Sequence, residues 1–445
     1  MAGTPNPVDV YTKQRRIAML AAESPQRALT SLNHYLDLDW LREAFRRTRK
    51  DGAPGVDGQS WADYAANLEE NLQSLLDRAK SGTYRAPPVR RVHIPKGGSM
   101  AETRPIGIPT IEDKVLQRAV EMLLEAVYRW DFHQCSYGFR RGRSAHQALS
   151  DFRSQATEMR VEWVLEVDIR KFFDTLDHRH LRDWLQLRVR DGVILRLIGK
   201  WLQAGVLEEG VLTHPQAGTP QGGVISPLLA NVYLHYVLDQ WFHQEVLPRL
   251  RGRAMLIRYA DDFVIGFTDE EDARRVLEVL PKRFGKYSLT IHPDKTRLVP
   301  FRKPRGPRQP SGHDGPGTFD FLGFTHYWGR SRKGYWVIKL KTASSRFTRA
   351  VQAISVWCQR NRHLPIAEQH RVLCQKLRGH FNYYGITGNS AWLARFRHEV
   401  SGLWCKWLRR RNDRQPPWSW FQRIMERHPL PPPIAIHSAY RAAKS

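Results

Sequence analysis

The sequence predicts an α+β fold whose last third is mainly helical. Residues 116–130 repeat apolar side chains with a helical period, whereas residues 161–168 and 255–267 hold short apolar and β-branched runs that are typical of strands. Residues 300–317 contain five prolines and four glycines, which indicates a linker or a long surface loop. A β-hairpin and several helices are expected after this loop. The expected hairpin spans residues 319–340, and the expected helices span residues 347–357, 369–384 and 393–410.

The composition indicates a globular protein with a basic surface. The chain has 445 residues, of which 41% are hydrophobic and 15 are tryptophan, so it can bury sizeable cores and is not disordered throughout. No run approaches about 18 consecutive apolar residues and the N-terminus shows no secretion signal. We therefore expect a cytoplasmic protein, free or associated with the nucleoid, with no membrane partner. The four cysteines lie too far apart for a zinc knuckle or a disulfide framework, so we expect buried, reduced thiols.

The positive charge is concentrated in the last third of the chain. The formal net charge is +26, and residues 301–445 contribute +21 of it, with 27 Lys and Arg against 6 Asp and Glu. Such an asymmetry favours a polyanion as partner, because each phosphate paired with Lys or Arg releases condensed counterions. The alternative is a basic face that only contacts solvent. The rings of Trp404 and Trp407 are expected in a helix core, which leaves the neighbouring arginines as candidates for phosphate contact: Arg409, Arg410 and Arg411.

Two adjacent acids stand at the tip of a predicted hairpin. In MLIRYADDFVIGF two apolar runs flank Asp261 and Asp262, and a separate predicted strand ends at Asp168 before a helix expected to begin near Asp174 or Thr175. An isolated Asp-Asp turn is more often structural than functional. The third acid, at the end of a strand, makes a functional role more plausible here, because this strand and the hairpin can pair side by side.

Pairing of these elements would bring three carboxylates together. Two unit charges about 4 Å apart repel by roughly 4 kcal/mol at an effective dielectric of about 20, so the cluster alone would destabilise the fold. Mg²⁺ reverses this sign, because it prefers hard oxygen ligands, and a pair of Mg²⁺ ions stabilises the attacking and leaving oxygens of an in-line displacement. The sequence therefore predicts phosphoryl transfer at Asp168, Asp261 and Asp262.

Three motifs resemble the reverse transcriptase encoded by group II introns, also called the intron maturase. They are YADD at residues 259–262, EVDIRKFFDTLDH at 166–178 and AGTPQGGVISPLLANVYLH at 217–235. One departure is Arg141, where the family commonly has proline. Further family motifs stand in the expected order, so the resemblance covers nearly the whole chain: KDGAPGVDG at 50–58, YRAPPVRRVHIPKG at 84–97, RPIGIPTIEDKVLQRAV at 104–120, YGFRRGRSAHQA at 137–148, FDFLGF at 319–324 and GHFNYYGITGN at 379–389.

The resemblance implies a right-hand polymerase fold in three parts. Residues 1–160 would form an N-terminal extension and the fingers, residues 161–326 the palm with the YADD hairpin and the primer grip, and residues 327–445 an α-helical thumb, the maturase domain. Larger family members append a zinc-containing endonuclease after the thumb. We expect no such domain here, because the sequence holds no cysteine pair that could bind its zinc.

The resemblance also implies roles for individual residues. Asp168 and Asp261 would be the principal ligands of two Mg²⁺ ions, with Asp262 as the third acid. Phe173 would lie beneath the sugar of the incoming nucleotide and exclude a 2′-hydroxyl, thereby selecting dNTPs; a ring that only fills the core is the alternative. Lys295 would protonate the departing pyrophosphate; an exposed strand-end lysine is the alternative. The other implied contacts are Lys96, Arg104 and Gln221 with the nucleotide, and Phe321, Leu322 and Gly323 with the primer.

We therefore expect an RNA-directed DNA polymerase that uses two Mg²⁺ ions and dNTPs. Its partners would be an RNA template, a DNA or RNA primer, and group II intron RNA whose splicing and mobility it assists. Two alternatives stay open: a stand-alone relative acting in DNA repair or defence, and a non-catalytic maturase that only binds RNA. The intact YADD motif argues against the second, because a scaffold needs no clustered carboxylates. The sequence does not predict the oligomeric state.

Overall fold

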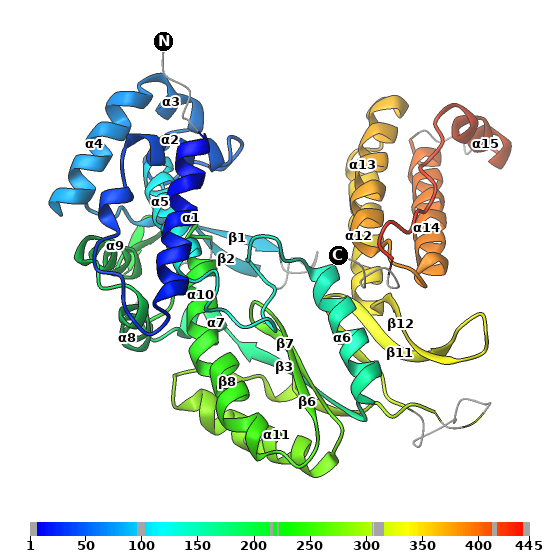
Figure 1. Cartoon of the computed structure of the whole chain (residues 1–445). Helices are drawn as coiled ribbons and strands as arrows, with labels where there is room; N and C mark the ends of the chain where they lie inside the picture. The colour runs from blue at the N-terminus through cyan, green and yellow to red at the C-terminus, as the bar shows by residue number, and fades with distance from the viewer. Residues whose placement is uncertain are drawn as a thin grey trace.

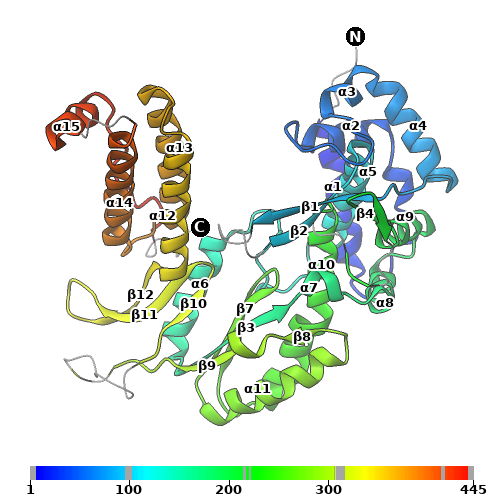
Figure 2. The ribbon, with the colours of Figure 1, turned by 180° about the vertical axis from the view of Figure 1, so that it is seen from behind.

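The computed structural model describes residues 7–95, 103–213, 217–219, 222–304, 306, 316–411 and 416–438. These residues form the mixture of helices and sheets that the sequence predicts. Figures 1 and 2 show the N-terminal helices and the C-terminal helices on opposite sides of a central sheet. We use the names fingers, palm and thumb for the N-terminal, central and C-terminal parts.

Helices make up most of the fingers, and three of them begin at a side-chain cap. The helices are α1 (Pro7–Glu23), α2 (Leu38–Arg47), α3 (Trp61–Ala66), α4 (Leu68–Ser81) and α5 (Ile111–Val127). Asp37, Ser60 and Thr110 cap α2, α3 and α5 by accepting a hydrogen bond from a backbone N–H of the first turn. α5 confirms the helix predicted over residues 116–130 and is buried on most of its faces, at the centre of a core shared with the palm.

A four-stranded sheet completes the fingers, in the order β2-β1-β4-β5. Its strands are β1 (Val89–Pro95), β2 (Thr103–Ile108), β4 (Val206–Glu208) and β5 (Val211–Thr213), and the helices α8 (His178–Arg188) and α9 (Gly192–Leu202) precede β4. β4 pairs parallel to β1. Residues 206–213 lie within the predicted palm of residues 161–326, and they join β1 in this sheet; the domain bounds stay a prediction. Local patterns do not show which distant strand a short strand will join.

The palm is a sheet in the order β6-β7-β3-β8, with β9 also paired to β3. Its strands are β3 (Trp163–Arg170), β6 (Ala254–Tyr259), β7 (Asp262–Phe267), β8 (Thr290–Ile291) and β9 (Arg297–Pro300). Along β3, Leu165 and Val167 pack in the core shared with the fingers, whereas Val164 packs in a second core beneath α6 (Ala145–Met159). Both faces of the sheet are therefore covered, which explains the almost continuous apolar runs in its sequence.

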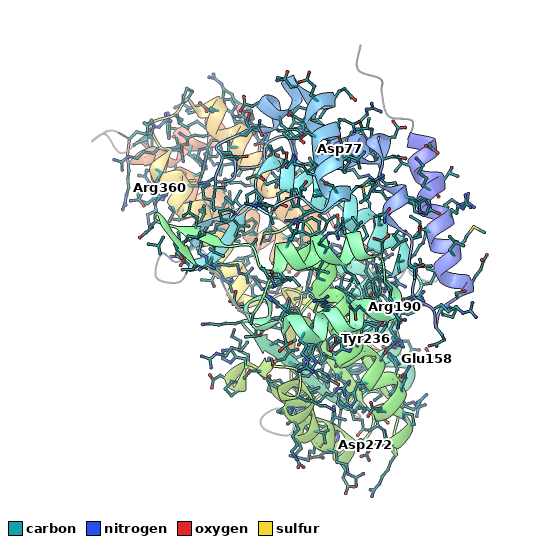
Figure 3. The ribbon with its side chains drawn as sticks, turned by 90° about the vertical axis from the view of Figure 1, so that its left-hand side faces the viewer. Asp77, Glu158, Arg190, Tyr236, Asp272 and Arg360 are labelled. Atoms are coloured by element: carbon teal, nitrogen blue, oxygen red, sulfur yellow. The ribbon has the colours of Figure 1, made fainter. Side chains whose placement is uncertain are left out.

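Helices on the fingers side of the palm sheet are α7 (Phe172–Thr175), α10 (Ser226–Leu234) and α11 (Glu270–Gly285). α7 begins at Phe172, two residues before Asp174, the earlier of the two predicted starts, because Lys171 takes a left-handed conformation that turns the chain out of β3. Figure 3 places Asp77 of α4 at the upper end of the molecule and Asp272 of α11 at the lower end.

A third sheet connects the palm to the thumb. It consists of β10 (Phe319–Phe321), β11 (Phe324–Arg330) and β12 (Trp336–Thr342), paired in that order. β11 and β12 confirm the predicted hairpin, and β10 adds a strand at its edge. Residue 326, the predicted palm–thumb boundary, lies within β11, and the sheet ends at Thr342, shortly before the first thumb helix.

The described part of the thumb confirms the three predicted helices and adds a fourth. They are α12 (Ser344–Arg360), α13 (Ile366–Tyr384), α14 (Ser390–Arg409) and α15 (Trp418–Arg427). Trp404 and Trp407 are 0% and 8% exposed, which confirms that they belong to the helix core. The four cysteines are free and buried, as expected. Among the residues that the structure describes, no helix has the length and apolar content needed to span a bilayer.

Candidate active site

Two adjacent strands carry the three predicted acids to one place. β6 and β7 pair antiparallel around a turn of Ala260 and Asp261, so the predicted hairpin is confirmed. On its other side β7 pairs with β3, and Asp262 is the direct register partner of Asp168. Facing residues of antiparallel strands point to the same face of a sheet. Asp168 and Asp262 therefore share a face, beside the turn that carries Asp261.

Burial and mutual repulsion disfavour negative charge on this cluster. Burial raises the pKa of Asp262 to about 7, and the charge of Asp261 adds to the rise, while a backbone hydrogen bond from Leu322 opposes it. Burial also raises the pKa of Asp261; its own backbone amide opposes this rise, and the charge of Asp168 adds to it. Asp168 is more open, with 40% of its side chain exposed. A cation beside the acids would relieve this repulsion.

The donor set suits Mg²⁺ that shares its ligands with a substrate. Within the described ranges, no group of three or more His, Cys, Asp or Glu side chains is arranged so that it could hold a metal ion. Mg²⁺ is usually bound by one or two carboxylates together with waters and substrate phosphates, so an all-protein cage is not required. Asp168 and Asp261, whose charges interact, offer two hard carboxylate ligands. The acids fit magnesium as partial ligands, and not as a closed three-carboxylate site.

A buried arginine holds the turn from inside the palm. Arg258 is 0% exposed, and its guanidinium pairs with both carboxylate oxygens of Asp239, at 2.8 and 2.6 Å. One of its terminal nitrogens also donates to the carbonyl oxygen of Ala260 at 3.0 Å. Ala260 has a left-handed backbone with φ of 57°, which is costly for a residue with a Cβ. Arg258 is thus a positioning residue that sequence reasoning missed; the available signal was a charge inside an otherwise apolar strand.

The start of the YGFRRGRS motif packs against the outer edge of the same strand. The N–H of Arg258 donates to the carbonyl oxygen of Cys135 at 2.8 Å, and the N–H of Tyr137 donates to the carbonyl oxygen of Arg258 at 2.9 Å. A Cβ on Gly138 would lie 2.4 Å from the backbone nitrogen of Ala260, so only glycine fits there. This motif therefore supports the turn that carries Asp261.

Lys295 lies beside Asp168. Its Nζ donates to Oδ2 of Asp168 at 2.8 Å, and 54% of its side chain is exposed. Lys295 ends a short 3-10 turn, and the N–H of the preceding His292 donates to the backbone carbonyl oxygen of Asp168 at 2.8 Å. The structure thus brings the lysine to the acids, while its half-exposed place also fits the alternative of a strand-end lysine.

Phe173 and the glycine-rich loop lie next to each other. Phe173 is half-buried and packs against the edge of the shared core. The N–H of Thr219 donates to its carbonyl oxygen at 2.8 Å, and a Cβ on Gly218 would lie 2.7 Å from the same oxygen. A Cβ on Gly222 would lie 2.4 Å from the carbonyl oxygen of Gly107 on β2. The loop therefore joins Phe173 to the fingers through close backbone contacts.

Arg104 brings positive charge from the fingers to the acids. It is exposed on β2, where it pairs in register with Ile94 of β1. Its charge lowers the pKa of Asp261, against the larger effect of burial, so the two groups are close enough to interact. Its contact with a triphosphate stays a prediction. Lys96 and Gln221, the other implied nucleotide contacts, lie outside the described residues.

The predicted primer grip is the tip of a hairpin beside Asp262. Leu322 and Gly323 are its two turn residues, with φ of 51° and 79°. The backbone amide of Leu322 reaches the carboxylate of Asp262. Phe321, in contrast, is 1% exposed and belongs to the second palm core. The turn residues are therefore the part of this motif that is open to a primer.

The three candidate RNA-binding arginines have different surroundings. Arg410 is exposed, and its guanidinium carbon lies 5.2 Å from the ring centroid of Trp407. Arg409 is half-buried at the end of α14. Arg411 donates to the carbonyl oxygens of Arg362 and Leu364, which close a neighbouring thumb loop. Arg409 and Arg410 thus stay candidates for phosphate contact, whereas Arg411 is engaged within the thumb.

Residues 94–326 match the family model described as "Reverse transcriptase (RNA-dependent DNA polymerase)". The match includes the three acids, Arg104, Phe173 and the hairpin tip at residues 322–323. In Escherichia coli (strain K12), "Protein YkfC" is 36% identical over 361 residues, which cover 72% of this chain and 89% of YkfC.

Two further relatives have names that refer to introns. "Group II intron-encoded protein LtrA" of Lactococcus lactis subsp. cremoris is 38% identical over 225 residues, which cover 48% of this chain and 37% of LtrA. "Putative COX1/OXI3 intron 1 protein" of Saccharomyces cerevisiae is 32% identical over 312 residues, which cover 59% of this chain and 37% of that protein. This chain thus spans most of YkfC but little more than a third of the two intron-named relatives.

Proposed function

Because this chain belongs to the reverse transcriptase (RNA-dependent DNA polymerase) family, we propose that it extends a primer along an RNA template at Asp168, Asp261 and Asp262. The observation that carries this proposal is the register of β3 and β7, which sets Asp168 opposite Asp262 and beside the Asp261 turn. Clustered, partly buried acids whose pKa values are raised by burial and by each other support cation binding at this point.

Asp168 and Asp261 would hold the Mg²⁺ ions. When bound, these ions would supply Lewis-acid stabilisation of the charge that develops on the phosphoryl oxygens. Arg258 would keep the Asp261 turn in place through the carbonyl oxygen of Ala260, so that the acid needs no rearrangement during the reaction. Arg104 would add a positive donor on the fingers side, where the triphosphate carries its charge.

Selection of dNTPs would depend on the ring of Phe173. The backbone of this residue is fixed by the hydrogen bond from Thr219 and by the close approach of Gly218. A half-buried ring on a fixed backbone is a suitable steric barrier to a ribose 2′-hydroxyl. Lys295, in contact with Asp168, would hold a proton at Nζ that the departing pyrophosphate could accept.

We also propose that the protein binds structured group II intron RNA. Two relatives have names that refer to introns, and the charge of +21 on residues 301–445 supports contact with a long polyanion. Exposed basic side chains on the thumb, such as Arg410, would supply part of this surface. Phosphate contacts of this kind position an RNA, and recognition of its shape would come from how they are spaced.

Primer extension tests the polymerase proposal. A DNA primer annealed to an RNA template is incubated with the full-length protein, four dNTPs and Mg²⁺, and a parallel reaction contains EDTA. Full-length cDNA in the Mg²⁺ reaction alone is the expected result. Support of intron splicing without any extension would instead favour the non-catalytic maturase.

The intron proposal has its own test. The protein should bind the RNA transcribed from the DNA around its gene more tightly than an unstructured RNA of equal length at the same salt concentration. Equal affinity, together with flanking DNA that cannot fold into an intron, would favour a stand-alone polymerase.

A further inference from the structure

The GHFNYYGITGN motif, to which the resemblance assigns no chemistry, forms the joint between thumb and palm. Asn389 accepts from the N–H of Thr342 at 2.9 Å and donates to the carbonyl oxygen of Tyr384 at 2.8 Å, which ties the end of β12 to the end of α13. From the other side, Nε2 of His146 on α6 lies 2.7 Å from the carbonyl oxygen of Tyr383. The last turn of α13 is thus held between the third sheet and α6 (Figure 1).

The side chain of Tyr383 extends from this joint to the primer turn. Its hydroxyl donates to the carbonyl oxygen of Leu322 at 2.8 Å. The amide of the same Leu322 reaches the carboxylate of Asp262. Leu322 therefore uses its two backbone groups as two links, one to a catalytic acid of the palm and one to the thumb. Its φ of 51° is a conformation that a residue with a side chain keeps only when its surroundings hold it.

The surroundings of Tyr383 fit a fixed donor. The residue packs half-buried against the second palm core, with its ring centroid 5.8 Å from that of Phe324. Burial raises the pKa of the phenol, and the nearby Tyr384, Tyr259 and Asp262 raise it further, so the hydroxyl keeps its proton at neutral pH. Tyr259 and Asp262 are the first and last residues of the YADD motif. The hydroxyl is therefore within electrostatic reach of the catalytic hairpin.

We propose that Tyr383 is a positioning residue that couples the thumb to the catalytic centre. Through its hydrogen bond to Leu322 it sets the primer turn relative to Asp262, and with it the primer 3′ end. If the thumb moves away from the primer–template duplex, this hydrogen bond would break and the turn would lose one of its restraints. The statement about the primer rests on the proposed function, whereas the link between Tyr383 and Leu322 does not.

Hydrogen exchange and primer extension of the full-length protein test this coupling. Tyr383→Phe removes the hydroxyl alone, and Tyr384→Phe is the matched control, because its ring packs on the same turn at Gly323 without bonding Leu322. In Tyr383→Phe the amides of residues 319–324 should exchange about three- to tenfold faster, as expected for the loss of one hydrogen bond. The kcat of single-nucleotide addition should fall by a similar factor, with the Kd for primer–template within about twofold of wild type.

The two readouts separate the possible results. Equal exchange rates of the 319–324 amides in Tyr383→Phe and Tyr384→Phe would overturn the coupling. Faster exchange throughout the thumb together with a loss of primer–template affinity would also overturn it, because a merely structural role of Tyr383 produces that result. If the wild-type protein extends no primer, the proposed function fails, and the exchange comparison still decides whether Tyr383 holds the turn.

Discussion

The ammonium of Lys295 and the carboxylate of Asp168 form an ion pair, with Nζ 2.8 Å from Oδ2, at the end of the strand that pairs with the YADD hairpin. The two side chains are 54% and 40% exposed, and an ion pair so open to solvent adds only about 0–1 kcal/mol of stability. Its position matters more for chemistry. The same carboxylate oxygen would serve Mg²⁺, so the ammonium and the ion compete for it.

Lys295→Ala should change both catalysis and Mg²⁺ binding. If Lys295 is the general acid, the single-turnover rate of nucleotide addition should fall about 100-fold or more. Because Asp168 loses its competing cation, the Mg²⁺ concentration that gives half of the metal-induced rise in Tm should also fall. Rapid-quench kinetics and thermal unfolding measure the two effects. Lys282→Ala on α11 is the control and should keep the wild-type rate. A rate of Lys295→Ala within twofold of wild type would show that Lys295 is not the general acid.

Arg258→Met should destabilise the protein strongly. Removing one member of a buried ion pair leaves the other charge without a partner and typically costs about 3–5 kcal/mol, and here Asp239 would be left with 0% of its side chain exposed. The control is Arg297→Ala, which breaks a more open pair with Glu166 and should cost about 1 kcal/mol or less. Urea unfolding measures the free energy of unfolding of each variant.

A second change on the partner tests the same network. Arg258→Met combined with Asp239→Leu should lose less stability than the sum of the two single changes, because neither charge is then stranded. The double variant should still synthesise cDNA slowly, since Ala260 keeps no guanidinium at its carbonyl oxygen. Additive losses would show that the pair does not act as a unit.

Asp262 predicts a pH dependence of stability. Its pKa is raised from 3.8 to about 7 by burial and by Asp261. In the metal-free protein the folded state therefore keeps a proton that the unfolded chain has released, so this group lowers stability progressively as the pH rises from about 4 to about 7. Asp262→Asn removes the effect. In EDTA the Tm of the variant relative to that of wild type should rise as the pH increases from 5 to 8. A constant difference in Tm across that range would contradict the raised pKa of Asp262.

Arg409 and Arg410 should contribute to RNA binding, whereas Arg411 should not. Removing one arginine–phosphate pair lowers the slope of log K against log salt by about 0.7–0.9, so Arg409→Gln with Arg410→Gln should flatten the salt dependence. Arg411→Gln should leave the slope unchanged and lower Tm, because Arg411 bonds carbonyl oxygens within the thumb. The reverse pattern in filter-binding titrations would place Arg411 on the RNA.

Local sequence patterns predicted the elements that carry their own periodicity. The YADD hairpin has two apolar runs around a turn, the helices α12 to α14 have helical apolar patterns, and the structure confirms all of these elements. The convergence of Asp168 with the hairpin needed the further assumption that the two elements pair, which the register of β3 and β7 confirms.

Features that depend on distant partners could not be predicted in this way. β4 joins β1 by parallel pairing, and nothing in its three residues indicates that partner. The buried pair of Arg258 and Asp239 links a strand to the helical segment after α10, whereas a lone arginine in a strand normally indicates exposure to solvent. The hydrogen bond between Tyr383 and Leu322 likewise joins two motifs that lie far apart in the sequence.

Asp261 is the acid on which cDNA synthesis should depend most directly. Single-nucleotide addition to a primer on an RNA template, with Asp261→Ala beside wild type, tests this dependence. Asp294, whose side chain is 88% exposed, provides the control Asp294→Ala. We predict that wild type and Asp294→Ala extend the primer in Mg²⁺, and that Asp261→Ala adds no nucleotide while it binds primer–template with unchanged Kd. Extension by Asp261→Ala at the wild-type rate would show that the reaction takes place elsewhere.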